Sequence, residues 1–101
     1  MDTTAQDAAE RAHKAHSAIV EHRYYFGPKI TQITRMDGAT MCLSSAAHSG
    51  DRVRVAWNTQ APDGRVEDTG IIDMAAGDPR SIDRRIGDWA KEITPDPDTE
   101  I

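Results

Sequence analysis

Three turn signals divide the middle of the chain into four short segments, and this spacing constrains the fold more than any other feature. The signals are Asp37-Gly38, Ser49-Gly50-Asp51 and Pro62-Asp63-Gly64, combinations suited to a positive φ or to the fixed φ of proline. Because the connections are short, we expect the segments between them to be strands of an antiparallel meander. The predicted strands cover residues 29–36, 39–46, 52–59 and 65–74.

An amphipathic helix is predicted after the last of these strands. Asp78 supplies an N-cap acceptor and Pro79 suits the first helical position, while the Thr94-Pro95 step ends the helix. We expect its apolar face to cover the predicted strand at 52–59, in which apolar and polar residues alternate cleanly. The apolar face consists of Ile82, Ile86, Trp89, Ala90 and Ile93.

A first helix is predicted from a capping-box spacing at Thr4 and Asp7 to the helix-ending pair Gly27-Pro28. Its stripe is mostly alanine until Ile19, and alanine buries little surface unless the helix packs very closely on a partner. We therefore predict a homodimer formed through this stripe. The predicted dimer interface is Ala8, Ala12, His16 and Ile19.

These elements together predict an α+β fold, with an N-terminal helix, an antiparallel sheet of about four strands and a C-terminal helix packed on the sheet. Residues 50–55, followed by Gly64 and Gly70, also resemble the strand-entry pattern of a small SH3-like barrel, which is the alternative. Leu, Ile, Val and Phe supply only 15 of the 101 residues, so the core must be small. We expect one domain over residues 1–94 and an acidic tail over 95–101.

Charge and composition exclude several classes of protein. The net charge is −5, which disfavours binding to nucleic acid or to anionic membranes. No run of 18 apolar residues is present to span a membrane, and the first residues lack the apolar segment of a secretory signal. The single cysteine, Cys42, cannot form an internal disulfide. We expect a cytoplasmic protein.

No catalytic residue, metal site or cofactor is predicted. His13 and His16 share a helix face, but His22 points elsewhere and no cysteine or acid pair completes a metal site. Cys42 and His48 would act as nucleophile and base only if the fold brought them together. We instead expect Cys42 to be a buried structural residue. A metal-binding or enzymatic domain that uses the N-terminal histidines remains an alternative.

Two groups of residues are predicted to contact a partner protein. Tyr24-Tyr25-Phe26 contains three of the five aromatic residues, and no single face can bury all three rings. At least one ring is therefore exposed or used in a contact, or else the junction folds back and two rings complete the core. Arg52 and Arg54 share the outer face of one predicted strand, and Arg65 can join them from the next. A plain solvated face and a nucleic-acid patch are the alternatives for these arginines.

The sequence therefore predicts a non-enzymatic protein that binds another protein or macromolecular complex, as a small inhibitor or adaptor. Small size, acidic charge and a composition rich in Ala, Asp and Arg lead us to expect that a virus or mobile element encodes it and that it acts on a host complex. The main alternative is an SH3-like module that contacts nucleic acid through Trp57 and the three arginines.

Overall fold

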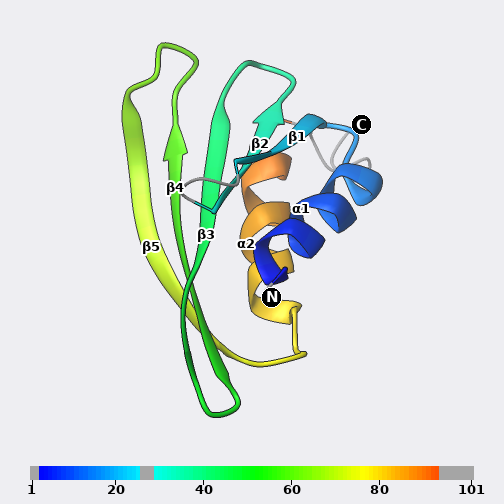
Figure 1. Ribbon diagram of the computed structural model, residues 1–101. Helices are drawn as coiled ribbons and strands as arrows, with labels where there is room; N and C mark the ends of the chain where they lie inside the picture. The colour runs from blue at the N-terminus through cyan, green and yellow to red at the C-terminus, as the bar shows by residue number, and fades with distance from the viewer. Residues whose placement is uncertain (1–2, 26–28, 94–101) are drawn as a thin grey trace.

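Two helices pack on one face of a five-stranded antiparallel sheet in the computed structural model of the protein (Figure 1). The structure describes residues 3–25 and 29–93. The predicted α+β arrangement of N-terminal helix, antiparallel meander and C-terminal helix is confirmed. The elements are α1 (Thr4–Ala15), β1 (Ile19–Tyr25), β2 (Ile30–Arg35), β3 (Thr40–Ser49), β4 (Arg52–Gln60), β5 (Val66–Ala75) and α2 (Arg80–Lys91).

The strands follow one another in the order β1-β2-β3-β4-β5, so β1 and β5 form the two edges of the sheet. All three predicted turns connect neighbouring strands, and Gly38, Gly50 and Gly64 in these turns have φ values of 94°, 61° and 90°. An L side chain is strained in that region, which explains the glycines. Within the described ranges nothing pairs β1 with β5, so the SH3-like barrel is not confirmed.

The first helix is shorter than predicted, and the difference adds a strand. α1 ends at Ala15, and His16 has an extended backbone with φ −122° and ψ 113°. Ile19-Val20 and Tyr24-Tyr25 are β-branched and aromatic residues, which pack well on a pleated sheet. They form β1, which pairs with β2. The prediction that the first helix continues through Ile19 toward Gly27-Pro28 is therefore wrong.

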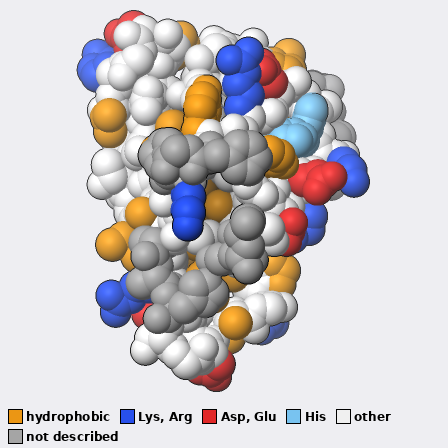
Figure 2. Space-filling view, in the orientation of Figure 1, with side chains coloured by type: hydrophobic (Ala, Val, Ile, Leu, Met, Phe, Trp, Pro, Cys, Tyr) orange, Lys and Arg blue, Asp and Glu red, His pale blue; other side chains and the backbone are white. Residues whose placement is uncertain are grey.

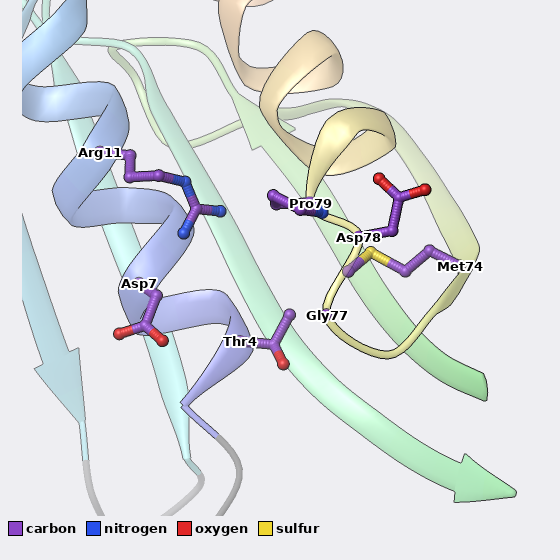
Figure 3. A pocket seen from close by; sticks show the side chains of 7 residues that line it. All are labelled: Thr4, Asp7, Arg11, Met74, Gly77, Asp78 and Pro79. Carbon is purple, nitrogen blue, oxygen red and sulfur yellow. The ribbon is translucent and has the colours of Figure 1, made fainter. Parts of the chain in front are cut away.

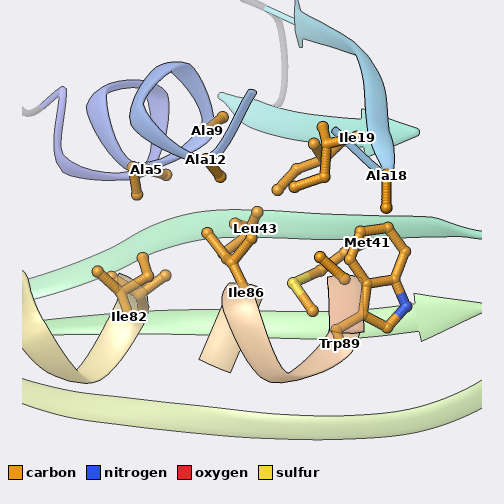
Figure 4. Packing of buried hydrophobic residues seen from close by; sticks show 14 of the residues in the cluster. Ala5, Ala9, Ala12, Ala18, Ile19, Met41, Leu43, Ile82, Ile86 and Trp89 are labelled. Carbon is orange, nitrogen blue, oxygen red and sulfur yellow. The ribbon is translucent and has the colours of Figure 1, made fainter. Parts of the chain in front are cut away.

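The alanine stripe of α1 is used inside the chain. Ala5 and Ala12 point from α1 toward α2, and Ile82 and Ile86 point back (Figure 4). Small side chains let the two helices and the sheet approach closely, which is the only way that an alanine face buries much surface. Ala8 also lies in this core and has no exposed surface.

This packing removes the argument for the predicted dimer interface. Ala8, Ala12 and Ile19 are at most 6% exposed within a single chain, so they offer no surface to a second copy. His16 faces α2, where a Cβ added at Gly87 would lie 3.3 Å from its Nε2 atom. The homodimer stays a prediction, but this stripe does not support it.

The second helix and its buried face are confirmed. α2 begins at Arg80, so its N-cap is Pro79 and not Asp78 as predicted. The Asp78 carboxylate accepts a hydrogen bond from the backbone N–H of Arg80 at 3.3 Å. Ile93 is half-buried, and the other four predicted residues are buried. They are Ile82, Ile86, Trp89 and Ala90.

A buried arginine connects α2 to the β2–β3 turn. Arg35 is 7% exposed and donates two hydrogen bonds to the Asp37 carboxylate, at 2.9 and 2.8 Å. It also pairs with Glu92 at 3.0 Å. The Arg35 guanidinium holds the pKa of Asp37 below its ordinary value. Arg35 lies at the end of a strand and is separated from Glu92 by 57 residues, so no local pattern in the sequence indicates this pair.

In the described part of the chain, no helix is long and apolar enough to cross a membrane. The predicted acidic tail at 95–101 and the aromatic residue Phe26 lie outside the described residues.

Candidate interaction surface

One face of the sheet carries no helix, and a row of side chains crosses this open face. Tyr25 pairs with Ile30, and Ile30 pairs with Ser44. Ser44 pairs with Ala56, and Ala56 pairs with Ile71. Residues opposite one another in a ladder point to the same face. The five residues therefore form a single cross-strand row, with one member from each strand.

The alternation of burial shows that this row lies away from the helices. Ile33 and Thr31 on β2 are buried under the helix layer, whereas Ile30, of opposite parity, is not. On β1, the Tyr24 hydroxyl lies 3.4 Å from the carbonyl oxygen of Gln6 in α1 and donates to it. Tyr25 points the other way and is 41% exposed. The predicted aromatic cluster is therefore divided between the two faces of the sheet.

The cross-strand row has large apolar side chains at both ends and the small residues Ser44 and Ala56 on the two central strands. Ile71 is 69% exposed, the highest value among the large exposed hydrophobic residues of the structure. Ile30, Ser44 and Ala56 are half-buried. Single exposed apolar residues are ordinary, but here Tyr25 and Ile71 are aligned across the sheet with Ile30 and two small residues, Ser44 and Ala56, between them. The row is thus a shallow apolar strip.

Polar side chains border this strip on both sides. One neighbouring row has a single charged residue, Arg23. Its hydrogen bond with Glu21 is the main cause that raises the pKa of Arg23, and a hydrogen bond with Tyr25 adds to it. The row consists of Arg23, Gln32, Cys42, Asn58 and Thr69. Protein interfaces have the same pattern, with few charges at the centre and a polar rim.

The opposite border contains two of the three predicted arginines. Arg52 lies 3.0 Å and Arg54 3.7 Å from the carboxylate of Asp73 on β5. Arg65 is at the far end of the β4–β5 hairpin, where its backbone N–H donates to Asp63 at 3.0 Å. The structure therefore brings Arg52 and Arg54 to the open face and does not bring Arg65 to them.

Cys42 also lies on the open face, which corrects the prediction that it is buried in the core. It is half-buried, and the side-chain nitrogen of Gln60 lies 3.8 Å from its Sγ atom. Burial raises the pKa of the Cys42 thiol, so the thiol stays protonated at neutral pH. His48 is opposite Val53 in the ladder, whereas Cys42 is opposite Asn58. Five ladder positions, about 16 Å, separate the two residues.

The histidines pair differently from the predicted arrangement. The rings of His13 and His22 are 4.9 Å apart and nearly perpendicular, and His22 also lies 5.1 Å from the Tyr24 ring. His16 is elsewhere, against Gly87. Among the side chains that the structure describes, which leave out those of residues 46–48, no group of three or more His, Cys, Asp or Glu is placed to hold a metal ion.

A cavity of about 130 Å³ lies between α1 and the loop that precedes α2 (Figure 3). Its charged groups are engaged within the fold. Arg11 pairs with Asp83 at 2.9 Å, Asp78 pairs with Arg80 at 2.8 Å, and the Asp7 carboxylate accepts a hydrogen bond from the Thr3 hydroxyl at 3.0 Å. The Arg80 pair and the hydrogen bond from its backbone N–H lower the pKa of Asp78 to about 2.

Figure 2 shows part of the helix-bearing side, in the orientation of Figure 1. Hydrophobic side chains reach that surface as separate spots among charged ones. Trp57 points to this side, where Arg85 stacks on its ring at 4.4 Å. It is thus on the opposite face from Arg52 and Arg54, and the residues predicted to contact nucleic acid are not brought together.

Comparison of the chain with protein-family models, with curated proteins and with solved structures gives no match. Its function is therefore inferred from its own surface.

Proposed function

We propose that the protein is a non-enzymatic protein-binding module and that the open face of the sheet is its binding surface. The observation that supports this most strongly is the cross-strand row, which places exposed Tyr25 and Ile71 at the two ends of one apolar strip. Neighbouring strands are about 4.8 Å apart, so the strip is about 19 Å long. An exposed strip of that length suits another folded protein better than a small molecule, which needs a concave site.

The charge distribution favours a protein partner over nucleic acid. The two arginines at the border of the strip share the single carboxylate of Asp73, so little positive charge is left for phosphate groups. The chain as a whole has a net charge of −5, which repels a phosphate backbone. A module of this kind, acting in the cytoplasm, would work as an inhibitor or adaptor of a larger complex. A virus or mobile element remains the proposed source.

The proposal predicts that binding energy is concentrated at the apolar ends of the strip. Complete burial of one isoleucine or tyrosine side chain contributes about 1.5–3 kcal/mol. Replacement of Ile71 by glutamate removes this contribution and places an unpaired carboxylate in the contact. Because Ile71 lies outside the core, the fold itself should tolerate the change.

The test is a comparison of two glutamate variants as baits in cells of the native host. Ile71→Glu lies in the strip, whereas Met36→Glu makes the same change at a residue that is 64% exposed in the β2–β3 turn. The proposal expects a purified partner that binds the wild-type chain and Met36→Glu equally, and Ile71→Glu at least tenfold more weakly. Equal affinity for both variants would contradict it, provided that both melt as the wild type does.

A further inference from the structure

The outer edge of β5 is free, and a groove runs beside it on the helix-bearing side. No strand within the described ranges pairs with this edge. A cavity of about 330 Å³ lies between β5 and α2. Its apolar lining contains Trp57, Ile71 and Ile72, and its charged groups are Arg84, Arg85 and Asp88.

Gly70 allows Trp57 to reach across β5 to this edge. The two residues are opposite each other in the β4–β5 ladder. A Cβ at position 70 would lie 2.5 Å from Cζ2 and 2.8 Å from Nε1 of the indole, closer than atoms can pack. The indole therefore lies directly on the β5 backbone. A side chain from a strand added beyond β5 would meet its rim.

Arg85 has no carboxylate partner in this groove. Its guanidinium stacks on Trp57, and its Nε atom is buried without a hydrogen-bond acceptor. A buried donor of this kind is unfavourable unless a ligand supplies the acceptor. Across the described residues, neither Arg85 nor its neighbour Arg84 forms an ion pair, so both charges are available to an incoming carboxylate.

The charge reverses farther along β5. Arg85 also borders a second cavity of about 200 Å³, whose wall includes Glu67, Asp68 and Glu92. Asp68 is two residues from Gly70, a separation of about 6.6 Å along a strand. This equals the distance between successive side chains on one face of an added strand. The groove thus offers a cationic position and an anionic position in register with such a strand.

We propose that β5 binds an extended segment of a partner protein by strand addition. The segment carries an acidic side chain that reaches Arg85 across Trp57, and a basic side chain two residues away that reaches Asp68. Main-chain hydrogen bonds to β5 supply affinity, and the two charges set the register. The β5 strand of a second copy does not fit, because β5 has three acidic residues and no basic one.

The probe is a synthetic heptapeptide, Thr-Val-Glu-Val-Lys-Val-Thr, added to the full chain. The readout is amide hydrogen exchange measured by NMR, together with the shift of the Trp57 indole N–H signal. We expect protection of β5 amides and a Kd that weakens about tenfold in Arg85→Gln, the effect of losing one charge-assisted hydrogen bond. Lys91→Gln removes one charge from an exposed residue of the same helix and should bind as the wild type does.

A second peptide keeps the test independent of the stability of the variant. With glutamine in place of glutamate, the peptide should bind the wild-type chain about tenfold more weakly. Equal affinity of the two peptides, protection of β1 rather than β5, or no protection at millimolar peptide would overturn the proposal. Ile71 lies on β5 and also lines this groove, so Tyr25→Glu, at the other end of the strip on β1, tests the open face separately from strand addition.

Discussion

The guanidinium of Arg35 lies over the indole ring of Trp89, 4.8 Å from the ring centroid, and donates a hydrogen bond of 2.8 Å to the carbonyl oxygen of the same residue. Arg35 ends β2, and Trp89 lies in the last turn of α2. One side chain therefore satisfies a carbonyl near the end of the helix, packs on its largest buried ring and fixes the helix to the sheet.

Arg35→Ala should lower the free energy of unfolding by about 3 kcal/mol, because it leaves a buried carbonyl without its donor and opens space beside Trp89. Urea denaturation measures the change. Arg11→Ala is the matched control, since the Arg11–Asp83 pair is exposed on both sides. Its loss should be below about 1 kcal/mol. Equal losses in the two variants would show that Arg35 does not hold α2 in place.

Stability should fall in acid partly through Asp37. Its pKa in the folded chain is lowered, chiefly by the hydrogen bonds from Arg35. The contribution of this pair is therefore complete above the unfolded-state pKa of about 3.9 and is lost as the pH falls through the lower folded-state value. Urea denaturation at a series of pH values between 6 and 2 should give a shallower acid decline for Asp37→Asn. Identical pH profiles would refute the role of this pair.

Gly70→Ala should destabilise the chain by about 1–3 kcal/mol, because the new methyl group overlaps the indole of Trp57. The indole must move, so its fluorescence should change as well. A double-mutant cycle with Trp57→Leu isolates the clash. Gly70→Ala should lower the free energy of unfolding less in the Trp57→Leu background than in the wild type, because the indole is then absent. Additive losses would mean that Gly70 is needed for another reason.

Ile19→Asp and Val20→Asp distinguish internal packing from a dimer seam. Ile19 is 2% exposed and Val20 is 53% exposed. A carboxylate at position 19 should unfold the chain, because it is buried without a partner. The same change at position 20 should alter stability by less than about 0.5 kcal/mol. Thermal melting measures whether each variant folds, and sedimentation measures whether it is a monomer or a dimer. If the wild type were a dimer and Ile19→Asp a folded monomer, the dimer interpretation would be restored.

The meander and α2 could be predicted because their signals are local. Each turn is indicated by its own glycine, and α2 is indicated by the spacing of Ile82, Ile86 and Trp89. Both signals can be recognised within a few neighbouring residues of the sequence. β1 was missed because the alanine spacing of α1 continues in phase to Ile19, and a pattern of small residues does not show where a helix ends. Only the β-branched and aromatic content of residues 19–25 could have indicated a strand.

The candidate surface could be predicted only in part. Tyr25 was identified as a contact residue because consecutive aromatic residues cannot share a face. Ile71 was not identified, because its exposure depends on the register between β4 and β5, and the sequence does not fix that register. The partnership of Arg35 with Trp89 and the position of Arg85 on Trp57 are likewise contacts between distant segments. No local pattern records them.

Both helices lie on the same side of the sheet, and this asymmetry separates two tasks within one small chain. Residues that face the helices must preserve the folded state, so few replacements are acceptable there. Residues on the bare side are not needed to preserve the folded state in this way. Their identities can be redesigned while the scaffold persists, so the bare side could be given a new partner without loss of the fold.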